Sequence, residues 1–203
     1  MRLFVALDID DSIRQRLARF LDGVHGFAPD ARWVRPESLH VTLKFIGEKP
    51  GEMLEPIKSG LANIQGETVD LAFRGYGFFP APKSARVFWI GMEAGSQLAT
   101  LAANVDRALS VLGIPQEDRP YSPHLTLARG GGGSGAPGRQ KTDRPNRVFQ
   151  RLQEKLELLP PPEFGAMTAR EFFLYQSQLG SGGSRYTKLA PFPLTGEHQG
   201  SYR

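Results

Sequence analysis

Cysteine is absent from the 203 residues of the sequence, and histidine occurs only four times. Without cysteine there is no disulfide framework, no thiolate metal site and no thiol nucleophile. A chain without cysteine fits a reducing compartment, so we expect a cytoplasmic protein. No apolar run approaches the ~18 residues of a membrane span. The apolar run from Leu3 to Leu7 is too short for the core of a signal peptide, and Asp8 and Asp10 follow it at once.

The remaining composition is that of an ordinary globular protein. Apolar residues make up 40% of the chain and charged residues 23%, which excludes an intrinsically disordered chain. The length allows one large domain or two small lobes, each with its own core. A net charge of +4 and a pI of about 9.5 suit a polyanionic ligand, although many proteins without such a ligand share this charge.

A short phrase occurs twice in the chain. It reads His40-Val41-Thr42-Leu43 in the first copy and His124-Leu125-Thr126-Leu127 in the second. β-Branched and apolar residues favour a strand in both copies. Because side chains alternate between the faces of a strand, each histidine shares a face with its threonine, and the two apolar residues share the other. We expect the apolar faces to pack into cores and the His/Thr faces to line an open groove.

Two histidines, each followed by a threonine, suit the cleavage of a phosphodiester. Imidazole titrates near neutrality, so one ring can take a proton from the nucleophile while the other gives a proton to the leaving oxygen. The threonine hydroxyls can donate hydrogen bonds to nonbridging phosphate oxygens. We therefore predict that His40 and His124 are catalytic, together with Thr42 and Thr126. This scheme needs no metal and no cofactor.

Other catalytic chemistries find less support. Each phrase offers one metal ligand, with no cysteine and no carboxylate cluster at ligand spacing. The other two histidines, His25 and His198, stand at a predicted helix end and in the C-terminal segment, where we expect solvated side chains. A serine hydrolase of the elbow type would need Gly-x-Ser-x-Gly, which the sequence lacks.

The order of predicted elements suggests an internal duplication. The first half reads as a strand over 2–8, a helix from Asp10 or Asp11 to about Val24, the first His strand, a helix over 52–64 and a strand over 68–79. The second half reads as a strand over 86–91, a helix over 96–112, the second His strand over 122–129 and a helix over 146–158. Strands over 168–179 and 186–189 follow.

The two His strands are offset by about as many residues as the two opening strands, which favours a duplication with drifted sequence. We expect a single domain over 1–194, with the boundary between its halves near 80–85, and a frayed tail over 195–203.

The stretch after the second His strand is rich in glycine. Gly130, Gly132 and Gly135 fit G-x-G-x-x-G, but a dinucleotide fingerprint must open a helix, and here Ala136-Pro137-Gly138 follows. We expect a flexible loop over 130–138 that borders the groove. A run of basic residues follows the loop. We expect it to form a solvated face of a helix, and the alternative is a patch that binds the RNA backbone. Its members are Arg139, Lys141, Arg144, Arg147 and Arg151.

The two phrases and their flanks resemble the 2H phosphoesterase superfamily, in particular its RNA 2′,3′-cyclic phosphodiesterase branch, also called 2′-5′ RNA ligase. The resemblance spans nearly the whole chain, and the glycine loop and the basic run depart from a compact member. The segments that carry it are Arg2 to Leu7, Trp33 to Gly47, Tyr121 to Arg129, Leu174 to Leu179, Tyr186 to Leu189 and Phe192 to Leu194.

The resemblance implies a bilobal α+β fold. Each of two pseudo-symmetric lobes would have an antiparallel sheet with outer helices, and the two His strands would flank a central cleft. It implies metal-independent hydrolysis of a terminal 2′,3′-cyclic phosphate on RNA to a 2′-phosphate, with His40, Thr42, His124 and Thr126 as the catalytic residues. Reversible 2′-5′ ligation of RNA is a further activity that it implies.

The resemblance also implies that Arg129 binds phosphate and that Phe45 stacks on the terminal base. Strict alternation along a strand opposes both roles, because it places Arg129 opposite His124 and Phe45 opposite His40. A bend or a bulge would re-aim these side chains. Because O3′ leaves in the family's reaction, and Phe45 would seat the nucleoside beside His40, we assign His40 as the acid and His124 as the base.

Two other functions stay open. One is a non-catalytic nucleotide-binding module of the same fold, and the other is a phosphodiesterase of 2′-5′ oligonucleotides or small cyclic nucleotides. The presence of both histidines and both threonines favours an enzyme. We expect a monomer, because the sequence shows no coiled-coil heptads and no unusual apolar patch.

Overall fold

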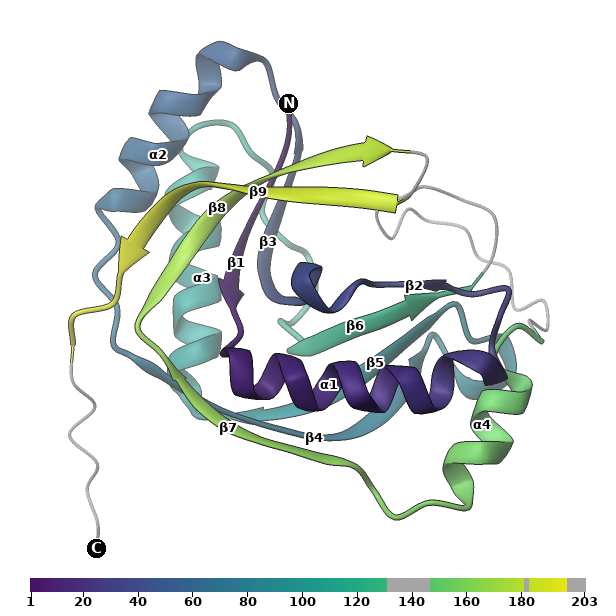
Figure 1. Ribbon diagram of the computed structural model, residues 1–203. Helices are drawn as coiled ribbons and strands as arrows, with labels where there is room; N and C mark the ends of the chain where they lie inside the picture. The colour runs from purple at the N-terminus through teal and green to yellow at the C-terminus, as the bar shows by residue number, and fades with distance from the viewer. Residues whose placement is uncertain (131–146, 181–182, 197–203) are drawn as a thin grey trace, which may run out of the picture.

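Two antiparallel β-sheets form the framework of the protein (Figure 1). The computed structural model describes residues 1–130, 147–180 and 183–196. The first sheet has the strand order β3-β1-β8-β9 and the second β2-β6-β5-β4-β7, which confirms the expected α+β class. In chain order the elements are β1 (Arg2–Asp8), α1 (Asp11–Val24), β2 (Arg32–Trp33), β3 (His40–Glu48), α2 (Leu54–Ala62), β4 (Val69–Phe79), β5 (Val87–Ala94), α3 (Ser96–Ser110), β6 (His124–Arg129), α4 (Gln150–Glu157), β7 (Glu163–Ala169), β8 (Glu171–Gly180) and β9 (Gly183–Pro193).

β1 lies inside the first sheet and buries apolar side chains on both faces. Alternate residues from Leu3 to Leu7 join the main core. Phe4 and Ala6 point to the other face, where they form a small second cluster with aromatic residues of β8, among them Tyr175. A strand that is covered on both sides favours a continuous apolar run, as this segment has.

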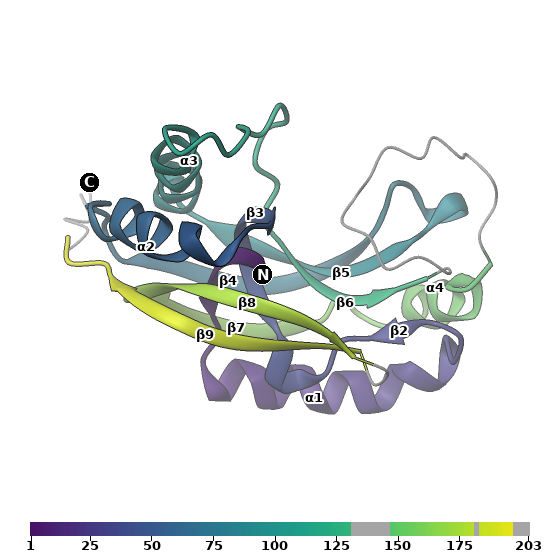
Figure 2. The same cartoon turned by 90° about the horizontal axis from the view of Figure 1, so that it is seen from above.

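Two of the helices, α1 and α3, pack against the sheet that does not contain the strand before them. α1 follows β1 of the first sheet but packs against β7 of the second, where Arg16 donates a hydrogen bond to the carbonyl of Phe164 at 2.9 Å. The stripe Ile13, Leu17, Leu21 and Val24 is buried, as its helical spacing predicts. α3 contacts β3 of the first sheet, and α2 lies beside α3 in both views (Figures 1 and 2).

The two sheets do not follow the two halves of the sequence. The strand predicted to close the first half is β4, yet it lies between β5 and β7 in the second sheet. The strands β8 and β9, from the end of the chain, complete the first sheet. β4 pairs with β5 because consecutive antiparallel strands joined by a short connection tend to pair, and only seven residues separate the two strands.

Most predicted boundaries are confirmed to within a few residues, and the exceptions have local causes. A 3₁₀ turn, Gly51–Met53, opens the segment predicted as one helix over 52–64. The C-terminal region contains β7, β8 and β9 where the sequence suggested two strands. β7 gave little signal because it has the sequence Glu-Phe-Gly-Ala-Met-Thr-Ala, in which strand-favouring residues are few.

The first two residues of the predicted frayed tail are held by hydrogen bonds. The amide of Thr195 donates to the carbonyl of Gly66 at 3.1 Å, and Gly196 forms a bridge with Glu67. Residues 195–196 are therefore tied to the segment before β4, and 197–203 lie outside the described residues. Within the described parts of the chain, no helix is long and apolar enough to cross a membrane.

A buried lysine fastens the first His strand to the second half of the chain. Lys44 of β3 is 3% exposed. Its ammonium group lies 2.5 Å from a carboxylate oxygen of Asp106 in α3, 3.5 Å from Glu117, and donates to the carbonyl of Pro115 at 2.7 Å. A buried charge needs such partners, because desolvation without them costs several kcal/mol.

Candidate active site

The first His strand contains a β-bulge at the leucine of its phrase. In the pairing of β3 with β1, Thr42 lies opposite Ala6 and Lys44 lies opposite Val5. Leu43 is the extra residue, so the alternation of β3 is reset after it. Leu43 and Lys44 are consecutive and both buried.

The second His strand contains the same irregularity at the same place. In the pairing of β6 with β5, Thr126 lies opposite Trp89 and Ala128 lies opposite Phe88, which leaves Leu127 as the extra residue. Leu127 and Ala128 are consecutive and both buried. The two phrases therefore share their bulge as well as their sequence.

The bulges return Phe45 and Arg129 to the faces of their histidines. Each of these residues is five positions after its histidine, where strict alternation predicts the opposite face. Phe45 is 40% exposed, and its ring centroid lies 6.1 Å from that of Phe4, which also contacts the imidazole of His40. The conflict between alternation and the predicted roles of Phe45 and Arg129 is thus removed by local backbone geometry.

Both imidazoles are held in the same way. Nδ1 of His40 lies 2.7 Å from the carbonyl oxygen of Ser38, and Nδ1 of His124 lies 2.8 Å from that of Ser122. A carbonyl only accepts, so Nδ1–H is the donor in each ring. This fixes the tautomer and leaves Nε2 as the nitrogen that can exchange a proton.

Aromatic rings flank each histidine. The ring of Phe4 lies 4.7 Å from that of His40, and Tyr186 meets His40 edge-on at 5.0 Å. On the other side, Phe79 meets His124 edge-on at 5.2 Å. Such walls remove water from the imidazoles, and desolvation disfavours their charged form.

The electrostatic environment lowers the pKa of both imidazoles. Desolvation is the main reason that the pKa of His40 falls to about 4, with the charges of Arg129 and Arg14 adding to it. The hydrogen bond to the Ser38 carbonyl and the carboxylate of Asp8 raise this pKa and oppose the shift. Lowered pKa values keep both rings neutral near pH 7. A bound anion would favour the protonated form of a neighbouring ring, because opposite charges attract.

His124 responds to the same influences. Desolvation lowers its pKa, the charge of Arg129 lowers it further, and the hydrogen bond to the Ser122 carbonyl opposes the shift. Arg129 therefore stands close enough to act on both histidines, although they belong to different sheets.

Further contacts bring the two phrases together. β3 and β6 contact each other directly. The hydroxyl of Tyr121, just before β6, donates to the carbonyl of Thr42 in β3 at 2.9 Å. Thr42 and Thr126 are each two residues after their histidine and before the bulge, so they share its face, and both are half-buried. These contacts bring the His/Thr faces of β3 and β6 near each other, and we refer to the region between these two faces as the groove.

An ion-pair network behind His40 was missed by sequence reasoning. Asp8 lies opposite His40 in the register of β1 and β3, and its carboxylate contacts Arg14 at 2.6 Å and Lys188 at 2.5 Å. Burial raises the pKa of Asp8, but these two cations lower it by more. Arg14 also donates to the backbone of the turn Pro36–Ser38 at 2.6 Å, the turn that presents the anchoring carbonyl. Nothing in the local sequence relates Lys188 to Asp8.

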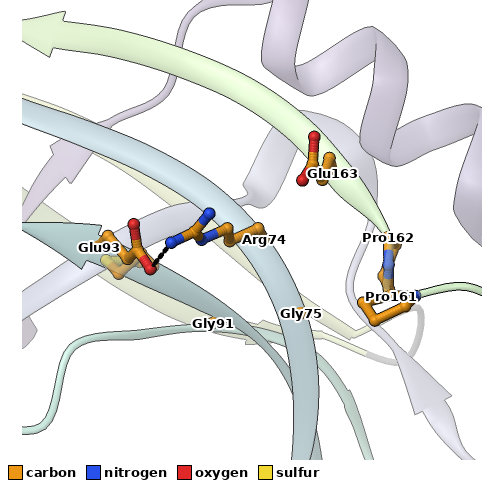
Figure 3. A pocket seen from close by; sticks show the side chains of 8 residues that line it. Arg74, Gly75, Gly91, Glu93, Pro161, Pro162 and Glu163 are labelled. Atoms are coloured by element: carbon orange, nitrogen blue, oxygen red, sulfur yellow. Dashed lines mark hydrogen bonds and ion pairs between the residues drawn. The ribbon is translucent and has the colours of Figure 1, made fainter.

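A separate hollow of about 460 Å³ lies at the edge of the second sheet, between β4, β5 and the segment before β7. Figure 3 shows the ion pair of Arg74 and Glu93 in it, with Glu163 and Pro162 on the other side. The Arg74 and Glu93 side chains are 54% and 59% exposed, and a solvated pair of this kind contributes about 0–1 kcal/mol. No histidine lines this hollow, so we place no reaction there.

The glycine-rich and basic segments are only partly described. Gly130 is buried, and its amide donates to the carbonyl of Arg86 at 2.8 Å. Arg147 and Arg151 are exposed and line a hollow of about 600 Å³. The rest of the predicted loop, 131–138, with Gly132 and Gly135, lies outside the described residues, as do Arg139, Lys141 and Arg144. In the described ranges, no group of three or more His, Asp or Glu side chains could hold a metal ion.

Comparison with known proteins matches most of the chain. The profile of the family described as LigT like Phosphoesterase matches residues 7–89 and again residues 90–186. The chain is 35% identical to a protein of Archaeoglobus fulgidus named RNA 2′,3′-cyclic phosphodiesterase, over 95% of this chain and 99% of that protein. It is 33% identical to a protein of the same name from Methanothermobacter thermautotrophicus, over 96% and 99% of the two chains.

Solved structures show the same similarity. A crystal structure of a Thermus thermophilus protein, TT0787, superposes with a TM-score of 0.75 at 29% identity, covering 98% of this chain and all of that one. The crystal structure of E. coli LigT complexed with 3′-AMP superposes with a TM-score of 0.74 at 28% identity, covering 96% of this chain and 98% of that one.

Proposed function

The chain belongs to the LigT like Phosphoesterase family, and on that premise we propose that it hydrolyses the 2′,3′-cyclic phosphate at the end of an RNA to a 2′-phosphate. Two relatives named RNA 2′,3′-cyclic phosphodiesterase align with 95% and 96% of this chain and support this substrate. The observation that carries the proposal is the matched pair of imidazoles, each held through Nδ1 by the carbonyl two residues before it, with Nε2 left for proton transfer.

The catalytic residues would be His40, His124, Thr42 and Thr126. Water attacks phosphorus, the bond from phosphorus to O3′ breaks, and the products are a 2′-phosphate and a free 3′-hydroxyl. One imidazole takes the proton of the attacking water, and the other gives a proton to O3′. The threonine hydroxyls donate to the nonbridging oxygens, whose charge grows in the transition state.

The groove also offers the groups that would bind the substrate. Arg129 lies near both imidazoles, so its guanidinium can contact a phosphate held between them. Phe45 is exposed on the same face as His40 and can stack on the terminal base. The complex of E. coli LigT with 3′-AMP supports a nucleotide site in this fold.

The division of work between the histidines is a further part of the proposal. We assign His40 as the acid and His124 as the base that activates water. Phe45 lies on the strand of His40 and would seat the nucleoside, with its O3′, beside that ring. The carboxylate of Asp8 raises the pKa of His40, whereas no carboxylate among the described residues has such an effect on His124. Desolvation keeps His40 neutral in the free protein, so its proton would arrive with the anionic substrate.

The same comparison supports a proposal for the domain organisation. We propose a single domain over 1–194 that arose by duplication, with the two strands of the groove as the corresponding parts. The consecutive matches of the family profile, the repeated bulge and the repeated imidazole anchor support it. We also propose a monomer. Few large apolar side chains are exposed in the described residues, and they belong to separate segments, namely β3, the end of α3 and the end of α4: Phe45, Val111, Leu158 and Leu159.

The central experiment uses an oligonucleotide that ends in a 2′,3′-cyclic phosphate, incubated with the protein in excess EDTA. We expect full conversion to a 2′-phosphate end, and no turnover by His40→Ala or His124→Ala. Conversion that stops in EDTA would contradict a metal-independent reaction. Tight binding of the oligonucleotide without turnover would instead indicate a non-catalytic module.

The acid is identified with a substrate whose 3′ leaving oxygen is replaced by sulfur, a leaving group that hardly needs a proton. Loss of the acid should then be largely tolerated, and loss of the base should not. We expect rescue of His40→Ala and none of His124→Ala. The reverse result would exchange the two roles, and rescue of neither would refute the acid–base scheme.

A further inference from the structure

Three arginines converge on one end of the groove. Arg129 is at the end of β6, and Arg32 lies directly opposite it in β2. Arg2 of β1 belongs to the other sheet, and it shares a face with Phe4 because residues two apart on a strand do so. The ring of Phe4 contacts the imidazole of His40.

The three guanidinium groups are near one another. Arg32 and Arg129 are direct cross-strand partners. Burial is the main reason that the pKa of Arg129 is lowered; the charges of Arg32 and Arg2 lower this pKa further, and Tyr186 opposes the shift. Arg129 also acts on both histidines, so the cluster is continuous with the catalytic groove. Among the described residues, neither Arg2 nor Arg129 forms a hydrogen bond or an ion pair with a carboxylate that would neutralise its charge.

The strand directions place this cluster beyond the nucleoside seat. β1 and β3 are antiparallel, with Asp8 opposite His40, Phe4 opposite Phe45, and Arg2 opposite Glu48. Moving from His40 past the row of Phe4 and Phe45 therefore leads to Arg2. β6 runs from His124 to Arg129, so Arg129 also lies at the opposite end of its strand from the histidine.

The charge at this end exceeds what the reacting group needs. A 2′,3′-cyclic phosphate is a diester and carries one negative charge, which Arg129 alone can balance. Holding Arg2 next to Arg129 costs free energy because the two charges repel each other, and a bound anion would offset that cost. The next anion in an RNA chain is the phosphodiester that precedes the terminal nucleotide.

We propose that Arg2 and Arg32, beside Arg129, form a second phosphate subsite that holds this preceding phosphodiester. This inference rests on the proposed function and names its substrate class as an oligonucleotide in preference to a mononucleotide. Contacts to phosphate from Arg side chains add affinity without reading sequence. The terminal base would lie on Phe45, which is 40% exposed, with the chain continuing toward Arg2.

The test compares three substrates: adenosine 2′,3′-cyclic phosphate, a diadenosine substrate with the same cyclic end and an ordinary linking phosphate, and its analogue with an uncharged methylphosphonate link. The two dinucleotides differ only in the charge at the proposed subsite. We expect the wild-type kcat/KM for the charged dinucleotide to exceed that for the neutral one by about tenfold, the scale of one charge-assisted hydrogen bond. The preference should decline with salt, because phosphate contacts release counterions.

The variants locate the subsite. In Arg2→Met the ratio of kcat/KM between the two dinucleotides should fall toward one, and Arg2→Lys should restore part of it because it keeps the charge. Arg32→Met should also lower the ratio. Arg19→Met, an exposed arginine on α1 away from the groove, is the matched control and should keep the wild-type ratio.

The outcomes separate the subsite from the reaction. A wild-type ratio near one, or a ratio that Arg2→Met leaves unchanged, would overturn the second subsite while leaving the proposed function intact. A melting temperature equal to that of the wild type confirms that Arg2→Met is folded, and Arg2→Lys supplies the test if it is not. No turnover of any of the three substrates would overturn the proposed function itself.

Discussion

Replacing Arg14 should damage the groove through the backbone that presents His40. Nη1 of Arg14 donates to the carbonyl of Pro36 at 2.6 Å, and Nη2 donates to Asp8 at 2.6 Å and to the carbonyl of Ile9 at 3.1 Å. The side chain is only 17% exposed. Arg14 thus joins the end of β1 to the turn whose Ser38 carbonyl orients the imidazole.

The expected loss of stability in Arg14→Met is about 3 kcal/mol. Each hydrogen bond from a charged donor contributes about 1.5–3 kcal/mol, and removing one partner of a buried ion pair costs about 3–5 kcal/mol. The lower end applies here because Asp8 keeps its contact with Lys188. Urea unfolding measures this change, and Asp11→Ala is the control, because Asp11 is 94% exposed and lies 3.8 Å from Arg14.

Activity and pH dependence separate a positioning role from a merely structural one. We expect kcat of folded Arg14→Met to fall by about tenfold to a hundredfold, since small displacements of catalytic groups have such effects. The positive charge of Arg14 lowers the pKa of His40 and the carboxylate of Asp8 raises it, so removing Arg14 should raise that pKa. The alkaline limb of kcat/KM should then move to higher pH. Wild-type stability, or reduced stability with unchanged kcat and pH profile, would refute this reasoning.

Four other predictions test the remaining parts of the site. Phe45→Ala should raise KM for a mononucleoside cyclic phosphate by about tenfold with little change in kcat, because base stacking contributes about 1–3 kcal/mol; an unchanged KM would assign Phe45 to packing alone. Thr42→Ala and Thr126→Ala should each lower kcat less than loss of either histidine, because each hydroxyl supplies one hydrogen bond of about 1.5–3 kcal/mol, and inactive threonine variants beside active histidine variants would reverse these roles. Asp106→Asn should lower the free energy of unfolding by about 3 kcal/mol, since it leaves the Lys44 ammonium buried with weaker partners; unaltered urea unfolding would contradict that cost. The pKa of both histidines is lowered in the free protein, so the acid loses its proton at lower pH than an ordinary imidazole. We therefore expect kcat/KM to decline already above about pH 6.5. A maximum of kcat/KM at about pH 8 would contradict the lowered pKa of the acid.

The proposed catalytic residues could be found from the sequence because their signal is local. His40, Thr42, His124 and Thr126 occur in two short phrases, and alternation along a strand is enough to put each pair on one face. The buried stripe of α1 and the apolar run of β1 were equally legible, since periodicity and hydrophobicity are properties of neighbouring residues.

The strand faces on which Phe45 and Arg129 lie could be determined only from the backbone of the folded protein. Alternation puts both on the wrong face, and only the bulges at Leu43 and Leu127 correct it. A bulge depends on how a strand pairs with its neighbour, so the strand alone carries little sign of it.

The identity of each sheet and the surroundings of His40 were decided by the tertiary structure. β4 belongs to the first half of the sequence, but it pairs with β5 and β7 in the second sheet. Asp8 and Lys188 are 180 residues apart in the chain and 2.5 Å apart in space. Propensity and periodicity act over a few residues, whereas the pairing of strands and the field on an imidazole are set by groups that meet only when the chain has folded.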